Sequence, residues 1–218
     1  MTLLVDAAEA RARMVEQQLR QRGILDERVV RAMGRVPREL FVPKDVQKYA
    51  YEDGALPIGH GQTISQPFIV ATICALLALA GGERVLDVGT GSGYQAAVLS
   101  ELAAEVVTIE RVPELAATAR AALAEAGYDG VDVRVGDGSV GVPERAPFGA
   151  IAIAAAAPTV PPALYAQLAE GGRLVVPRGS RWGQELVLVV RTAEGPSERA
   201  SVPCRFVPLL GEEGFAGS

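Results

Sequence analysis

Three acidic residues and a glycine-rich turn are the parts of this 218-residue chain best suited to bind a small molecule. The stretch RVLDVGTGSGY, residues 84–94, is an apolar run that reaches Asp87 and continues into glycines at alternate positions. Three glycines in five residues predict a backbone that turns sharply or lies against a ligand. The following residues, 94–102, have a helical pattern, so free N–H groups at the helix start would face the turn.

Two further acids stand at the ends of later apolar runs. Glu110 follows Gly89 by 21 positions, the place from which an acid accepts hydrogen bonds from ribose hydroxyls in dinucleotide folds. Asp137 would reach an adenine amino group, with the Gly138 backbone close to the ring. Any one of these acids alone would more simply be a solvated strand end or a helix cap. Together, at the carboxyl ends of successive strands, they predict a nucleoside site.

The nucleoside ligand could be a dinucleotide or S-adenosylmethionine. Tyr94 occupies the position of the third glycine in a dinucleotide fingerprint. Asp87, which we place at the end of the first strand, would repel a pyrophosphate but would favour an ammonium or sulfonium group. Charge complementarity therefore predicts S-adenosyl-L-methionine as the cofactor, with S-adenosyl-L-homocysteine as its product.

Apolar periodicity predicts an α/β protein that carries these residues on a mainly parallel sheet covered on both faces. An amphipathic helix over residues 4–22 and a short helix capped by Asp26 come first. A long glycine- and proline-rich loop over 54–67 leads into a buried helix at 68–79. Pro113 and Gly127 frame the clearest later helix. Strands are predicted at 85–88, 106–109, 131–135, 150–154 and 173–176, followed by an antiparallel hairpin of 185–191 and 202–207.

Composition narrows the function classes further. A net charge of −5, a pI of about 5.1 and scattered cations argue against a nucleic-acid partner. The longest apolar segment, 68–80, is shorter than the roughly 20 residues of a membrane span, and no signal-peptide pattern opens the chain. We therefore expect a cytoplasmic protein without a membrane partner. Cys74 and Cys204 are predicted to be buried free thiols, and no metal site is expected.

Several motifs closely resemble one family. They are the loop PIGHGQTISQP at 57–67, GTGSGYQAAVL at 89–99, TIER at 108–111, GDG at 136–138, APF at 146–148, AAAP at 155–158 and RFVPL at 205–209. In order and spacing, from about residue 14 to residue 211, they are similar to protein-L-isoaspartate O-methyltransferases. The glycine turn is common to methyltransferases in general, whereas the QTIS loop and the RFVPL tail are far more specific.

The resemblance implies a Rossmann-like class I methyltransferase fold and methyl transfer to the side-chain carboxyl of L-isoaspartyl residues in damaged proteins and peptides. It implies a region of N-terminal helices and active-site loop over 1–67, and a cofactor-binding core with a C-terminal substrate segment over 68–218. It gives Ser65 the catalytic role, which we interpret as orienting the acceptor carboxylate. The expected cofactor residues are Gln62, Thr63, Ser65, Asp87, Gly89, Thr90, Gly91, Glu110, Arg111, Asp137 and Gly138. The expected substrate residues are Thr63, Ile64, Ser65, Arg205 and Val207.

Some residues depart from the family pattern or suggest other roles. His60, the only histidine, is interpreted as a loop residue because an ionised carboxylate acceptor needs no general base. Gly149 stands where the family usually has Asp, and Ala154 stands where many members have Thr or Gly. The alternatives are a methyltransferase for RNA or a small molecule, and a non-catalytic S-adenosylmethionine-binding protein. We expect a monomer.

Overall fold

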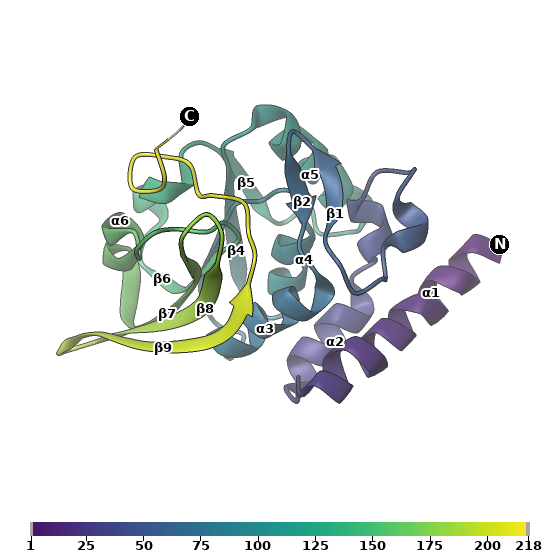
Figure 1. Cartoon of the computed structure of the whole chain (residues 1–218), viewed down its shortest axis with the longest axis horizontal. Helices are drawn as coiled ribbons and strands as arrows, with labels where there is room; N and C mark the ends of the chain where they lie inside the picture. Colours follow the sequence, from purple (N-terminus) through teal and green to yellow (C-terminus); the bar gives the residue numbers. More distant parts are fainter. Residues whose placement is uncertain (1, 217–218) are drawn as a thin grey trace.

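A seven-stranded sheet forms the centre of the computed structural model, which describes residues 2–216 and the side chains from residue 7 onward (Figure 1). The strand order is β5-β4-β3-β6-β7-β8-β9, with parallel pairing from β5 to β7 and antiparallel pairing from β7 to β9. The chain moves from β3 outward to β5 and then returns to β6 on the other side of β3. The strands are β3 (Arg84–Val88), β4 (Glu105–Glu110), β5 (Asp132–Val135), β6 (Phe148–Ile153), β7 (Leu168–Gly179), β8 (Gln184–Thr192) and β9 (Gly195–Cys204).

The helices begin and end largely where the sequence predicts. Asp26 accepts hydrogen bonds from the backbone of Arg28 and Val29, and Pro113 opens the helix that stops before Gly127. The first helix departs from the prediction because α1 passes into a π-helical turn at Val15–Leu19 and a 3₁₀ turn at Arg20–Arg22. The α-helices are α1 (Thr2–Met14), α2 (Glu27–Arg35), α3 (Pro67–Leu77), α4 (Tyr94–Ser100), α5 (Pro113–Glu125) and α6 (Pro162–Ala166).

Alternation along each strand divides the apolar side chains between two core clusters. Val85 belongs to the cluster shared with helices α2, α3 and α4, whereas Leu86 belongs to the cluster on the opposite face with α6 and Leu209. The N-terminal helices are part of the first cluster through Met14 and Val30. The N-terminal region and the strand core therefore share one packed interior.

The loop predicted over 54–67 is wrong in its secondary structure. Residues Leu56–Gly59 (β1) and Gln62–Ile64 (β2) pair as an antiparallel hairpin. Gly59, His60 and Gly61 all have positive φ in its turn, which two glycines permit and the histidine adopts at φ 51°. The segment had no recognisable alternation because the strands are only four and three residues long.

The strand predicted over 202–207 also differs from the structure. Strand β9 starts earlier and ends at Cys204, which pairs with Gln184, the first residue of β8. Since β8 offers no partner beyond Gln184, the residues from Arg205 onward leave the ladder. They cross instead to the segment that follows β6, where the backbone N–H of Ala156 donates to the carbonyl of Val207 at 2.8 Å.

Candidate functional site

A cavity of about 350 Å³ lies at the carboxyl ends of β3, β4 and β6, where the strand order reverses. Its walls come from five places: the turns after the parallel strands, the β1–β2 hairpin, α3, α4 and the C-terminal segment. The turn after β3 contributes Gly89–Ser92, the turn after β4 contributes Glu110–Pro113, and the C-terminal segment contributes Val207–Leu210. Segments more than 100 residues apart in the sequence thus enclose one space.

The glycine turn and Glu110 hold each other in place. The backbone N–H groups of Gly89 and Thr90 donate to the carbonyl of Ile109 at 2.9 and 3.2 Å, so the turn is tied to the end of β4. Oε2 of Glu110 accepts from the N–H of Gly91 at 2.8 Å, and Oε1 accepts from the N–H of Val112 at 3.0 Å. Each carboxylate oxygen keeps a second acceptor position. The carboxylate is therefore fixed at the cavity wall and able to accept hydrogen bonds from a ribose diol.

Asp87 lies one layer behind the cavity and does not line it. The strand ends at Val88, as predicted, and alternation along it directs the Asp87 side chain toward α4. Its carboxylate accepts from Nε2 of Gln95 at 2.8 Å and from Oγ1 of Thr108 at 2.9 Å. Complete burial raises the pKa of Asp87 to about 6, and the charge of Glu110 adds to this.

The Asp87 carboxylate also orders the hydroxyl groups beside the turn. The Thr108 hydroxyl has one proton, which it donates to Asp87, so the Thr90 hydroxyl must donate to Oγ1 of Thr108 across 2.7 Å. Any favourable effect of the Asp87 charge on a sulfonium ligand acts from behind the turn, without direct contact.

Asp137 is likewise turned away from the cavity, although its neighbour Gly138 lines it. Oδ1 of Asp137 accepts from the N–H and the hydroxyl of Ser139 at 2.8 and 2.7 Å. Oδ2 accepts from the N–H of Glu212 at 2.8 Å. A Cβ on Gly138 would lie 2.7 Å from Cγ1 of Val88, so the absence of a side chain lets this backbone pack against the end of β3.

The β1–β2 hairpin delivers the predicted polar loop to the cavity: Gln62, Thr63, Ile64 and Ser65 all line it. A second cavity of about 260 Å³ adjoins the first and contains Arg205. Four residues line both cavities: Thr63, Ser65, Ala154 and Val207. Ser65 therefore stands where two spaces meet, one beside the glycine turn and one toward the protein surface.

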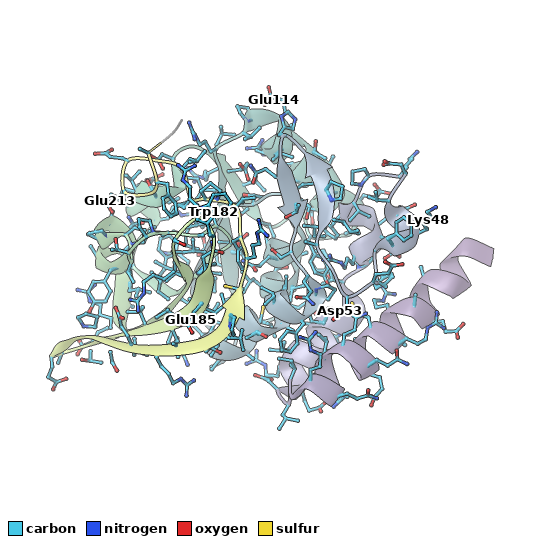
Figure 2. The ribbon with its side chains drawn as sticks, in the orientation of Figure 1. Lys48, Asp53, Glu114, Trp182, Glu185 and Glu213 are labelled. Carbon is cyan, nitrogen blue, oxygen red and sulfur yellow. The ribbon has the colours of Figure 1, made fainter. Side chains whose placement is uncertain are left out.

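Contacts around the second cavity fix its two sides. Asp53, labelled in Figure 2, accepts hydrogen bonds from Nε2 of Gln66 at 2.7 Å and from Arg22 at 2.9 Å. On the other side, the buried Gln184 accepts from the N–H of Phe206 at 2.9 Å through Oε1. The exposed Arg205 has no carboxylate within 4 Å among the residues that the structure describes.

The structure brings most of the predicted site residues together. Nine of the predicted cofactor residues line the first cavity: Gln62, Thr63, Ser65, Gly89, Thr90, Gly91, Glu110, Arg111 and Gly138. The predicted substrate residues line one cavity or both. Sequence reasoning missed Val112, Pro113 and the run Pro208–Leu210. The RFVPL motif was a signal for that last segment, but it did not show that its end faces the cofactor side.

The structure also places the two cysteines, His60 and Gly149. Cys74 is buried as expected, but Cys204 is only half-buried because it lines the second cavity. Burial raises the pKa of the Cys204 thiol to about 11. His60 is exposed in the hairpin turn, and neither cavity includes it. Gly149 lies near the amino end of β6, the end of the strand opposite the cavity.

The described residues contain neither a metal-ion site nor a membrane-spanning helix. No group of three or more His, Cys, Asp or Glu residues within 2–216 is placed to hold a metal ion. No helix in the same range is long and apolar enough to cross a membrane.

The first cavity suits S-adenosylmethionine by the chemistry of its lining. Val88, Ile109 and Leu209 line it with apolar surface that an adenine ring could contact, and the fixed Glu110 carboxylate could accept hydrogen bonds from a ribose diol. The left-handed Gly89 and Gly91 expose backbone rather than side chains to a ligand. The donor end of such a ligand would then lie toward Thr63 and Ser65.

Comparison with known proteins identifies the family. The family model described as protein-L-isoaspartate(D-aspartate) O-methyltransferase (PCMT) matches residues 9–214. Over 212 residues the chain is 56% identical to protein-L-isoaspartate O-methyltransferase 2 of Marinobacter nauticus, covering 96% of this chain and 97% of that protein. It is 53% identical over 210 residues to the Methanoculleus marisnigri protein-L-isoaspartate O-methyltransferase, covering 95% and 94%.

Solved structures agree with this relationship. A protein-L-isoaspartate O-methyltransferase superposes with a TM-score of 0.84 at 30% identity, over 93% of this chain and 66% of the other. A putative Plasmodium falciparum member, in complex with S-adenosyl-L-homocysteine, gives a TM-score of 0.78 at 25% identity, over 92% and 98%. The strand order, the cavity and the extent of these matches lead to one conclusion: the chain belongs to the protein-L-isoaspartate(D-aspartate) O-methyltransferase family.

Proposed function

We propose that this protein transfers a methyl group from S-adenosyl-L-methionine to the side-chain carboxylate of L-isoaspartyl residues in proteins and peptides. The observation that carries the proposal is the junction of the two cavities at Ser65. One cavity has the lining expected for a nucleoside methyl donor. The other opens beside Arg205 and has room for an acceptor side chain.

The reaction asks mainly for positioning. A carboxylate oxygen of the acceptor forms a bond to the methyl carbon as the bond from that carbon to sulfur breaks, and the sulfur keeps the bonding electron pair. The products are a methyl ester and S-adenosyl-L-homocysteine. Because the acceptor carboxylate is ionised at pH 7, no general base is required. Holding donor and acceptor in line can supply roughly 7–11 kcal/mol of the barrier.

Each predicted site residue that lines a cavity has a proposed task within this geometry. Glu110 accepts the ribose hydroxyls, and the Gly138 backbone lies against the adenine. Gln62 and Thr63 border the methyl donor, with Gly89–Gly91 and Arg111 on its other side. Ser65 orients the acceptor carboxylate with its hydroxyl group. Ile64, Arg205 and Val207 hold the polypeptide on either side of the acceptor.

The wider role follows from the product. The methyl ester of an isoaspartyl residue is an activated acyl group that cyclises to a succinimide, which can reopen to normal aspartate. We propose that the protein repairs damaged proteins in this way, in the cytoplasm and as a monomer, without nucleic-acid or membrane partners. The acidic net charge supports the expectation that nucleic acid is not a partner.

A matched pair of peptides tests the proposal. The protein is incubated with methyl-labelled S-adenosylmethionine and two peptides of one sequence, one with L-isoaspartate and one with L-aspartate. We expect base-labile label on the isoaspartyl peptide alone. Equal labelling of both peptides, or none, would overturn the proposal.

The same assay separates the alternatives. Label on RNA or on a small molecule would show a methyltransferase of another substrate class. Binding of S-adenosyl-L-homocysteine by calorimetry without any methyl transfer would show a non-catalytic binding protein. Ser65→Ala would leave the latter unaffected, since no acceptor has to be oriented.

A further inference from the structure

Asp137, the acid predicted to contact adenine, accepts a hydrogen bond from the C-terminal segment of the chain. Asp137 accepts the N–H of Glu212 at 2.8 Å, and Oγ of the buried Ser139 accepts the N–H of Glu213 at 3.0 Å. The Ser139 hydroxyl donates in turn to Oδ1 of Asp137 at 2.7 Å. Two side chains after β5 thus bind two consecutive backbone amides that lie about 75 residues later in the chain.

The segment that they bind is a closed turn, Gly211–Phe215, which we call the C-terminal turn. The N–H of Phe215 donates to the carbonyl of Leu209 at 2.7 Å. The carboxylate of Glu213, labelled beside α6 in Figure 2, accepts the N–H of Ala163 at 2.7 Å. The turn is therefore anchored both to the Asp137 region and to α6.

Close packing makes Gly211 necessary for this contact. A Cβ at Gly211 would lie 2.0 Å from Oδ1 of Asp137 and 2.4 Å from Oγ of Ser139. Neither acceptor is at the end of a long flexible side chain. Any side chain at position 211 would therefore push the C-terminal turn away from both acceptors.

The residues just before the C-terminal turn form a wall of the cofactor cavity. Pro208, Leu209 and Leu210 line that cavity. On their amino-terminal side, the backbone of Ala156 donates to the carbonyl of Val207 at 2.8 Å and accepts from the N–H of Leu209 at 2.7 Å. On their other side, the C-terminal turn holds them through the hydrogen bond from Phe215 to Leu209. The position of this wall depends on anchors at both ends.

We propose that Asp137 and Ser139 are positioning residues for the cofactor, which hold the C-terminal turn and thereby press the Pro208–Leu210 wall against the cavity. Because Ser139 and Gly211 do not line the cavity, their influence on cofactor affinity passes through this wall. The inference rests on the proposed function for the identity of the ligand. The anchoring of the turn itself can be measured without any ligand.

The test compares two ligands on three variants: Asp137→Asn, Ser139→Ala and Gly211→Ala. S-adenosyl-L-homocysteine has the adenine amino group, and S-inosyl-L-homocysteine has an oxygen in its place. We expect each variant to bind both ligands about tenfold more weakly by calorimetry, the effect of losing a buried hydrogen bond, with the ratio of the two affinities unchanged from wild type in Ser139→Ala and Gly211→Ala. Glu212→Ala is the matched control, because it removes an exposed side chain and keeps the backbone donor.

Two results would overturn the inference. One is a changed ratio of the two affinities in Ser139→Ala or Gly211→Ala, which would mean that these positions act at the adenine amino group and not through the wall. The other is unchanged affinity in Ser139→Ala and Gly211→Ala.

Hydrogen exchange of the free protein keeps the test independent of ligand. The amides of residues 209–213 should exchange at least tenfold faster in Ser139→Ala than in wild type, while those of β3 stay protected. Equal protection of the turn would contradict the anchoring. If the wild-type protein binds neither ligand, the proposed function has failed, and the exchange result still decides whether the anchor exists.

Discussion

At the scale of single residues, two side chains with similar sequence signals have different environments. Glu110 and Asp87 both end up buried near the glycine turn. Glu110 lines the cavity and accepts two backbone N–H groups, whereas Asp87 is enclosed by Gln95 and Thr108. The difference follows from the direction in which each side chain leaves its strand.

Asp87 should make stability depend on pH. Because its pKa is raised from the ordinary 3.8 to about 6, the folded state binds this proton more tightly than the unfolded state between those values. The free energy of unfolding therefore falls as pH rises through this interval, by about 3 kcal/mol for this residue. Asp87→Asn should remove this pH dependence. The free energy of unfolding of the variant, measured relative to that of wild type, should therefore be higher at pH 7.5 than at pH 4.

Chemical denaturation at these two pH values measures that gain. Asp129→Asn, at an exposed site, is the control and should not gain relative to wild type. A stability difference between Asp87→Asn and wild type that is the same at both pH values would contradict the assignment.

Ser65 should affect turnover more than cofactor binding. Ser65→Ala keeps the cavity but removes the hydroxyl group proposed to orient the acceptor, and poor alignment of reactants commonly costs about a hundredfold in rate. We expect kcat for an isoaspartyl peptide to fall by about that factor, with affinity for S-adenosyl-L-homocysteine within threefold of wild type. Steady-state kinetics and calorimetry measure the two effects. Ser201→Ala, on the exposed part of β9, should change neither.

At the scale of elements, a group of ion pairs joins the amino-terminal ends of neighbouring strands, at the opposite end of the strands from the cavity. Arg84 contacts Glu105 at 2.5 Å, linking β3 to β4. Arg145 contacts both Glu105 and Asp132, linking β4 to β5. The Arg84 contact lowers the pKa of Glu105, and the neighbouring Arg134 does the same for Asp132. These groups are about one-third exposed, so solvent weakens their interaction.

Arg145→Met should therefore destabilise the protein only slightly. We expect a loss of about 1 kcal/mol in the free energy of unfolding at low salt, decreasing in 1 M NaCl as the charges are screened. Affinity for S-adenosyl-L-homocysteine should stay unchanged because the pairs lie far from the cavity. Denaturation at two salt concentrations measures the first effect, and a loss that is independent of salt would point to packing of the arginine side chain instead.

At the scale of the whole molecule, the cofactor cavity is assembled from distant parts of the chain. The β1–β2 hairpin forms one side, the strand turns form the floor, and the C-terminal segment forms another side (Figure 1). A ligand in the cavity contacts all three at once. Binding must then stabilise segments that lie far apart in the sequence.

Hydrogen exchange should detect this linkage. Saturating S-adenosyl-L-homocysteine should slow amide exchange in 61–66 and 207–213 as well as in 89–93, because local opening of either segment would release the ligand. A ligand at 100 times its dissociation constant adds about 2.7 kcal/mol to the cost of such opening. Protection limited to residues 89–93 would show that the hairpin and the tail do not close on the cofactor.

The sequence by itself determined the elements whose signals are local. Periodicity, Pro113, Gly127 and the Asp26 cap placed strands and helices within a few residues, because propensity and capping depend on near neighbours. The glycine turn, Glu110 and the QTIS loop were also predicted to share one site, and nine of the eleven predicted cofactor residues line one cavity. The short strands of the β1–β2 hairpin escaped prediction because seven residues carry too little periodicity.

Only the tertiary structure decided what the other two acids contact. Asp87 faces Gln95 because its side chain leaves β3 on the face of the sheet that α4 covers, and the local sequence does not specify which helix covers which face. Asp137 meets the backbone of Glu212, a partner 75 residues away that no local pattern specifies. The local sequence determines which residues stand at the end of a strand. The packing of remote segments determines whether such a residue faces a ligand or binds another part of the chain.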